Sequence, residues 1–144
     1  MEKYEALKLE NQLCFPLYAA AKEIVRKYKP FLDELDLTYT QYITMMVMWE
    51  YSELNVKEIG DKLFLDSGTL TPVLKTLEHK GYITRNRDEH DERNVIIHIT
   101  DAGKKLKVQA LKVPEEISKC IKLSEEEATT LYNVLYKILD CVKE

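Results

Sequence analysis

Three cysteines, Cys14, Cys120 and Cys141, are the side chains of this 144-residue sequence best suited to covalent chemistry. They stand far apart and form no Cys-x-x-Cys pair or Cys/His cluster, so neither a disulfide framework nor a zinc site is indicated. A thiol can still react with a peroxide as its thiolate, when its pKa is lowered and hydrogen-bond donors steady the anion. Residue type alone equally allows an inert cysteine that fills apolar space.

Two tyrosines are candidate partners of Cys14. The hydroxyls of Tyr28 and Tyr39 could donate hydrogen bonds to the sulfur. Their rings would give an apolar lining suited to organic peroxides. The sequence shows that these residues exist and leaves their arrangement open.

Other kinds of chemistry find no support. His79, His90 and His98 have no second ligand residue at metal-binding spacing, so we expect no metal and no cofactor. A thiol peroxidase would need a thioredoxin-like α/β fold, and the chain has no parallel-strand pattern. We therefore do not expect an enzyme.

The composition is that of one folded, helix-rich chain. Hydrophobic residues make up 45% and charged residues 32%, with 4 Gly and 4 Pro, which excludes disorder as the main state. No stretch reaches the ~20 apolar residues of a membrane span and the N-terminus lacks a signal peptide, so we expect a cytoplasmic protein without membrane contact. The net charge is −4, yet residues 57–108 carry 10 Lys and Arg against 9 Asp and Glu, which leaves that segment free to approach phosphates.

The elements that must position these residues begin with a helix over residues 5–29, predicted from its apolar period. This helix holds Cys14. Pro16 removes a backbone donor, so we expect a kink beside Cys14, and we expect Pro30 to end the helix.

Capping patterns mark the starts of the next helices. Thr-x-x-Gln at 38–41 and Asn-x-x-Glu at 55–58 have the form of capping boxes. Asp66 or Ser67 can cap a further helix, which Gly81 closes. The second and third of these helices are short and closely joined, which predicts a helix-turn-helix.

The period then changes from helical to alternating. Residues 82–87 and 93–99 are rich in β-branched side chains, and the polar segment 88–92 lies between them. This pattern predicts a two-stranded hairpin. The expected fold class is mostly α-helical with a small β-hairpin, a winged helix-turn-helix.

Two helices are expected after the hairpin, one broken near Pro114 and one over residues 124–142. The terminal helices have apolar faces too large for a single small core, which predicts a two-fold homodimer. The expected organisation is therefore a winged helix-turn-helix DNA-binding domain at 37–100, with N- and C-terminal dimerisation helices at 1–36 and 101–144.

Candidate DNA contacts follow from this arrangement. The first turns of a recognition helix need small or hydrogen-bonding side chains to enter the major groove, and a basic hairpin can reach a minor groove or its phosphates. The Asp91 carboxylate could hold the Arg93 guanidinium in one pose. A plain helix cap and a solvated charged turn are the alternative readings. The candidates are Ser67, Thr69, Thr71 and Lys75 on the helix and Arg85, Arg87 and Arg93 on the hairpin.

Two stretches resemble a known family. The segment from Leu63 to Thr100, with LDSGTLTPVLKTLEHKGYITRNRDEHDERNVIIHIT, resembles the winged-helix core of the MarR family of bacterial transcription regulators. Its acidic-then-Arg wing, the alternating apolar residues and the Thr cap carry that resemblance. The segments LENQLCFPLYAA and YKPFLDELDLTYTQY resemble the organic-hydroperoxide-sensing (OhrR-type) branch of that family. Together the stretches cover nearly the whole chain.

The resemblance implies roles for the residues singled out above. Tyrosines matching Tyr28 and Tyr39 contact the reactive thiolate, which Cys14 would supply, and one matching Tyr18 reaches it from the other subunit. Oxidised Cys14 would form a disulfide either with a small cellular thiol or with Cys120 of the partner subunit.

The expected function is therefore a peroxide-responsive transcriptional repressor. A homodimer would bind double-stranded DNA at a pseudo-palindromic operator, and an organic hydroperoxide would release it by oxidising Cys14. A redox regulator of adhesion or virulence genes would share this chemistry. The alternative is a MarR-type regulator released by a small aromatic ligand, in a cleft lined by Tyr39, Tyr42, Met45 and Met46. Replacing Cys14 by Ser distinguishes the two, because a ligand sensor would still respond.

Overall fold

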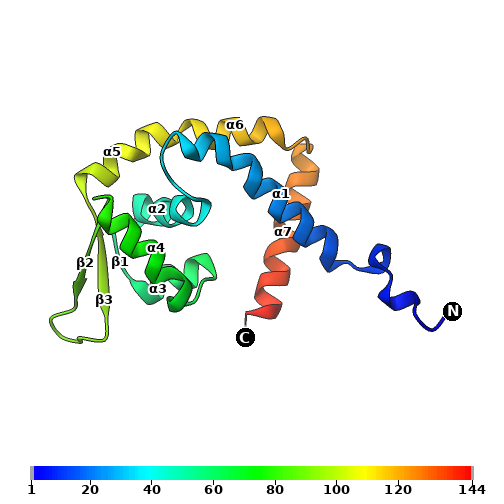
Figure 1. Cartoon of the computed structure of the whole chain (residues 1–144), viewed down its shortest axis with the longest axis horizontal. Helices are drawn as coiled ribbons and strands as arrows, with labels where there is room; N and C mark the ends of the chain where they lie inside the picture. The colour runs from blue at the N-terminus through cyan, green and yellow to red at the C-terminus, as the bar shows by residue number, and fades with distance from the viewer. Residues whose placement is uncertain (1, 144) are drawn as a thin grey trace.

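Residues 2–143, which the computed structural model describes, form a winged-helix lobe with long helices at both ends of the chain (Figure 1). Two short 3-10 turns, η1 (Glu5–Leu7) and η2 (Leu9–Asn11), precede the first helix. The remaining elements are α1 (Cys14–Asp33), α2 (Tyr39–Tyr51), β1 (Glu53–Asn55), α3 (Val56–Leu63), α4 (Ser67–His79), β2 (Ile83–Arg87), β3 (Val95–Ile99), α5 (Asp101–Ala110), α6 (Lys112–Cys120) and α7 (Glu125–Val142). The predicted class, mostly helical with a small sheet, is confirmed.

The helix starts follow the capping signals. Both side chains of each predicted capping box, at 38–41, 55–58 and 124–127, make the reciprocal bonds. Asp66, rather than Ser67, caps α4 by accepting a hydrogen bond from a backbone N–H. Gly81 follows α4 with φ +87°, a conformation that favours glycine.

The N-terminal helix differs from the prediction in both of its bounds. It begins at Cys14, because residues 5–11 form 3-10 turns. Pro16 thus lies in the first helical turn, where its missing N–H has no intrahelical partner, and it produces no interior kink. Pro30 does not end the helix, which continues to Asp33. Its missing N–H leaves one backbone carbonyl near the helix end without a partner. The helical turn that follows buries Leu32, which is 2% exposed, and this burial favours continuing the helix.

The sheet has one strand more than the predicted hairpin. Its order is β1-β3-β2, all antiparallel. The extra strand, β1, pairs Leu54 with Ile97 of β3. A three-residue strand carries no alternation of its own, so only its pairing with β3 defines it.

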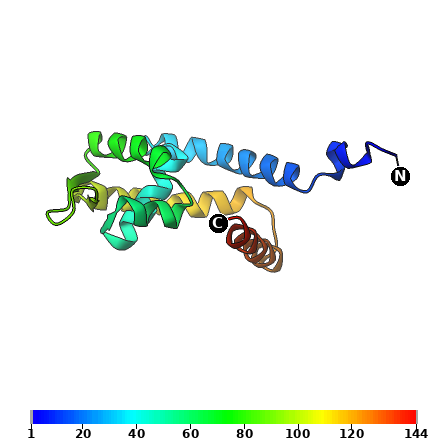
Figure 2. The same ribbon diagram turned by 90° about the horizontal axis from the view of Figure 1, so that it is seen from below.

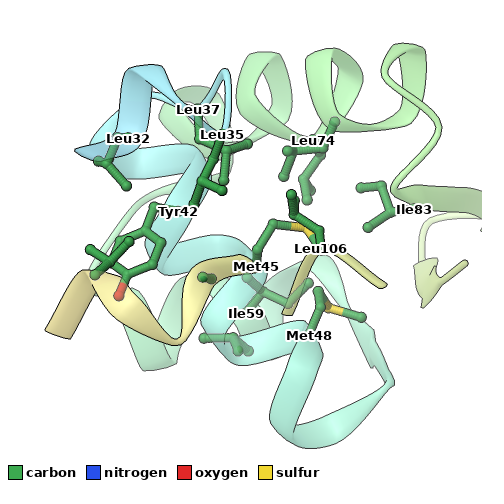
Figure 3. Packing of buried hydrophobic residues seen from close by; sticks show 14 of the residues in the cluster. Leu32, Leu35, Leu37, Tyr42, Met45, Met48, Ile59, Leu74, Ile83 and Leu106 are labelled. Atoms are coloured by element: carbon green, nitrogen blue, oxygen red, sulfur yellow. The ribbon is translucent and has the colours of Figure 1, made fainter. Parts of the chain in front are cut away.

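The core of the lobe lies between α2, the helix-turn-helix and the sheet (Figure 3). Met45 and Met48 of α2 are fully buried at its centre. Trp49 then ties α2 to α5, because its Nε1–H donates to the Gly103 carbonyl at 2.8 Å. Gly103 itself packs so closely on Tyr82 that an added Cβ would lie 2.3 Å from the Tyr82 carbonyl oxygen.

The terminal helices are packed far less completely. The α5–α6 rod breaks at Leu111, and Pro114 lies in the first turn of α6, as the sequence predicts. Figure 1 shows α7 running away from the end of this rod, and Figure 2 shows α1 and the rod lying side by side. No residue of α7 is buried among those described, and its exposed apolar side chains include Leu131, Tyr132, Val134 and Tyr136. No helix within residues 2–143 is long and apolar enough to cross a membrane.

Candidate DNA-binding and redox-sensing sites

Helix α4 has one buried and one outward face. The buried face is formed by Leu70, Leu74 and Leu77, all fully enclosed. Ser67, Thr71 and Lys75 recur every four residues and therefore form one stripe beside the buried face, with Thr71 half-buried. Small side chains at the start and a lysine two turns later make this face narrow enough to lie in a major groove.

The first turn of α4 is held in shape by its own polar groups. The Asp66 carboxylate accepts the Thr69 backbone N–H at 2.7 Å, and this bond, with further bonds from Thr69 and Gly68, lowers the pKa of Asp66. The Thr71 hydroxyl donates to the Ser67 carbonyl at 2.6 Å. Of the predicted helix contacts, Ser67, Thr69 and Lys75 are exposed.

The hairpin presents Arg93 near its tip. The Arg93 side chain is 94% exposed, and its Nε lies 3.3 Å from Asp91 Oδ1, which also accepts the Arg93 backbone N–H. This is the contact that an orienting role for Asp91 requires. Arg87 donates from Nη1 to the Glu92 carbonyl at 2.6 Å, which braces the base of the turn.

Arg85 differs from the other two wing arginines. Its backbone N–H and its Nε both donate to the Glu78 carboxylate of α4, at 3.2 and 3.3 Å, and its side chain is only 25% exposed. Arg85 thus fixes β2 to the end of α4. No sequence pattern predicts this pair, because the two charges meet only after the chain turns at Gly81.

Cys14 is the first residue of α1 and is exposed. Tyr18 follows one helical turn later on the same side, also exposed. Tyr28 lies fourteen residues along the same helix, roughly 21 Å away at 1.5 Å per residue. The chain therefore brings Tyr18 towards Cys14 and keeps Tyr28 away from it.

Tyr28 and Tyr39 do meet each other. Their ring centroids are 4.9 Å apart, and Tyr42, which the sequence analysis did not place in this group, stacks 5.9 Å from Tyr28. Burial, with the neighbouring Tyr39 and Tyr42, raises the pKa of Tyr28 to about 12. The hydroxyl therefore stays protonated at neutral pH and can act as a donor. The i, i+3 spacing of Tyr39 and Tyr42 was a usable sequence signal.

The remaining cysteines lie in the C-terminal region. Cys120 is the last residue of α6, exposed, and its thiol donates to the Glu116 carbonyl at 3.6 Å. Cys141 is exposed in the last turn of α7. Within residues 2–143 there is no cluster of His, Cys, Asp and Glu that could hold a metal ion.

The helix-turn-helix, with its outward face and basic hairpin beside it, defines a winged-helix DNA-binding protein (Figure 1). Residues 26–110 match the model of the SarA/Rot transcriptional regulators. The chain is 46% identical over 142 residues to the organic hydroperoxide resistance transcriptional regulator of Bacillus subtilis, covering 99% of this chain and 97% of that protein. It is 46% identical over 127 residues to the regulator SarZ of Staphylococcus aureus, covering 88% and 86%.

Solved structures agree with these relatives. The reduced regulator AbfR bound to DNA superposes with a TM-score of 0.78 at 36% identity, covering 99% of this chain and all of the other. The disulfide form of AbfR gives 0.68 at 34% identity, covering 99% and 97%. This protein belongs to the MarR/SarA group of winged-helix transcription regulators, and within it to the organic-hydroperoxide (OhrR) type. Its relatives are regulators and not enzymes.

Proposed function

We propose that Cys14 is the redox-sensing residue of this regulator and that its oxidation releases DNA. The observation that carries the proposal is the position of Cys14, exposed at the first turn of α1 in a chain similar over its whole length to an organic hydroperoxide regulator. The protein would act where its DNA lies, in the cytoplasm.

The oxidation step needs one organic hydroperoxide. The thiolate attacks the terminal peroxide oxygen, the O–O bond breaks, and the alkoxide leaves as the alcohol after taking a proton. The sulfur is oxidised to a sulfenic acid and the peroxide is reduced. A second thiol can then displace the hydroxyl, which leaves as water when the disulfide forms.

In this proposal the tyrosine cluster, which consists of Tyr28, Tyr39 and Tyr42, serves the cysteine of the other subunit. Because Tyr28 and Tyr39 lie far from Cys14 of their own chain, they can serve only the sulfur of a partner, whereas Tyr18 serves its own. A groove of about 400 Å³ opens beside Tyr39 and is rimmed by Lys22, Arg26 and Lys29. Asp33 also lines the groove and pairs with Lys29 at 3.0 Å, so the apolar walls and the remaining excess of positive charge suit a thiolate arriving from a second copy. This proposal reverses the division of tyrosines that the family resemblance implies.

A homodimer is therefore part of the proposal. The exposed apolar side chains of α7 and of the first half of α1 supply the faces that a second copy would cover. Two copies would present two α4 helices to half-sites about 34 Å apart on a pseudo-palindromic operator. Ser67, Thr69, Thr71 and Lys75 would enter the major groove, with Arg87 and Arg93 beside it.

Cys120 is the candidate resolving residue. A disulfide with Cys14 of a partner requires the two Cα atoms within about 7 Å. This chain superposes better on reduced AbfR than on its disulfide form, with TM-scores of 0.78 and 0.68. That difference supports a rearrangement on disulfide formation, which would disturb the spacing of the two α4 helices.

Operator binding by reduced protein, with and without cumene hydroperoxide, tests the proposal. The probe is a duplex selected by the reduced protein from a random pool. We expect the wild type to release DNA, Cys14→Ser to stay bound, and Cys120→Ser to lack the linked dimer on a non-reducing gel. Release by Cys14→Ser would overturn the sensor assignment.

One observation favours a second candidate, a regulator released by a small aromatic ligand. A cavity of about 320 Å³ between α2 and the α5–α6 break is lined by Tyr42, Met46, Trp49, Lys107 and Pro114. The aromatic walls and Lys107 suit an aromatic acid whose carboxylate lies away from Glu50, which also lines the cavity. Release of Cys14→Ser by such an acid, without peroxide, would support this candidate.

A further inference from the structure

Lys80, the residue directly after α4, turns its side chain into the protein. Its Nζ donates to the Asp36 carbonyl and, at 3.2 Å, to Gln41 Oε1, and it lies 3.5 Å from Asp36 Oδ2. The side chain is only 22% exposed. Three oxygens thus meet the three donors of an ammonium group that would otherwise extend into water.

The two Asp36 oxygens belong to the turn between α1 and α2, and Gln41 lies in the first turn of α2. Asp36 has φ +54°, in the left-handed region, where the chain reverses. Gln41 is 9% exposed and closes the capping box of α2, since its Oε1 also accepts the Thr38 backbone N–H at 3.1 Å. Lys80 therefore binds a segment whose conformation is fixed by its own hydrogen bonds.

Tyr39 of the tyrosine cluster lies in the same segment, as the first residue of α2. Tyr39 lies between Thr38 and Gln41, and its ring packs on Tyr28. On the other side of the tether, Glu78 in the last turn of α4 holds Arg85 of the wing. The Lys80 side chain thus joins the tyrosine cluster to the point where the recognition helix meets the wing.

The apolar contacts between these parts are of a different kind. Leu35 and Leu37 of the turn share one buried cluster with Leu74 of α4 (Figure 3). Such contacts hold the parts together but allow small sliding, because they have no fixed direction. Hydrogen bonds to an ammonium group are directional, so they fix where the end of α4 lies relative to the turn.

We propose that Lys80 is a positioning residue that couples the α1–α2 turn to the DNA-reading helix. A displacement of Tyr39, when the cysteine that a second copy brings to it is oxidised, moves the turn, and Lys80 makes the end of α4 and the wing follow. This coupling rests on the proposed redox function. It requires no contact between Lys80 and either DNA or oxidant.

The test compares operator affinity before and after oxidation in three variants. Lys80→Met removes the tether and keeps the apolar stem, Lys80→Arg keeps a cation, and Lys57→Met removes an exposed lysine paired with Asp61 on α3. The duplex selected by the reduced wild type is the probe, and one equivalent of cumene hydroperoxide per subunit is the oxidant. The ratio of the two dissociation constants is the readout, because a purely structural role would change both constants alike.

For Lys80→Met we expect the DNA affinity of the reduced protein to stay within threefold of wild type. Oxidation should raise its dissociation constant by a factor at least ten times smaller than in wild type. Lys80→Arg and Lys57→Met should keep the wild-type ratio. If Lys80→Met shows the same ratio of dissociation constants as wild type, the coupling is overturned. If the wild-type protein stays bound to DNA after peroxide is added, the proposed function is overturned instead. Should Lys80→Met not fold, Gln41→Glu retains the cap and strengthens the tether. Oxidation should then weaken DNA binding by Gln41→Glu more than it weakens binding by wild type. A ratio of dissociation constants equal to that of wild type would overturn the coupling.

Discussion

The winged-helix lobe and the terminal helices follow opposite packing rules. Within the lobe, one chain encloses its own core, and Met45, Met48, Ile59 and Ile97 are fully buried. Along α7 and the first half of α1, apolar side chains of the same kinds lie open. The lobe therefore encloses its core in a single chain, while the apolar faces of the terminal helices stay open for the second copy that we propose. In the dimer that we propose, regulation would act at the junction of the two regions, where a change in pairing can reach the DNA-reading helix.

The largest effect should come from opening the core of the lobe. Met45→Ala removes a fully buried side chain and should lower the free energy of unfolding by about 2–5 kcal/mol. Met46→Ala, one residue along and 45% exposed, is the matched control. Urea unfolding followed by circular dichroism checks this, and equal losses in both variants would contradict the contrast.

The converse change should spare the lobe and break the pairing. Leu131→Glu places a charge on the open face of α7, and it should weaken dimerisation by about a hundredfold while leaving helix content unchanged. Asn133→Glu adds the same charge to an exposed polar position of that helix. Sedimentation velocity across a concentration series measures both variants. A monomeric Asn133→Glu would show that charge alone, and not the apolar face, decides pairing.

The wing arginines should separate into two kinds. Arg93→Ala should weaken operator binding by about tenfold and reduce its salt dependence by roughly one counterion, as expected for a phosphate contact. Arg85→Ala should change the salt dependence less, because its guanidinium pairs with Glu78. Titrations at several salt concentrations provide the slopes. Equal slopes for the two variants would place Arg85 on the DNA as well.

The smallest effect concerns the cap of α4. Because hydrogen bonds lower the pKa of Asp66 in the folded state, its stabilising contribution is present above the unfolded value of 3.8 and is lost as pH falls through the folded pKa. Asp66→Asn keeps the cap without this titration. The stability of wild type relative to Asp66→Asn should therefore fall slightly below pH 4, in thermal unfolding from pH 7 to 3. A constant difference across that range would exclude the linkage.

Local signals predicted the fold well where neighbours in sequence decide the structure. The three capping boxes, the glycine after α4 and the hairpin are all of this kind. The strand β1 was missed, since three residues define a strand only through a distant partner. The helix start at Cys14 was missed because Leu7 and Leu13 keep a helical period without forming helix.

In the candidate sites too, contacts between neighbours in sequence could be predicted and contacts between distant residues could not. Asp91 and Arg93 lie two residues apart, and the sequence predicted their contact, which the structure contains. Lys80 reaches oxygens 39 and 44 residues earlier in the chain, and no sequence spacing predicts such a pair. The separation of Cys14 from Tyr28 was accessible from the sequence, because fourteen residues on one helix cannot fold back on themselves.

The bond from Trp49 to the Gly103 carbonyl places the sole tryptophan of the chain at the junction of lobe and terminal helices. The indole therefore serves as a built-in fluorophore for that junction. Its emission wavelength and quenching would report whether α2 and α5 stay joined while DNA or oxidant binds, without any attached dye. The protein thus carries its own optical readout of the movement that we propose.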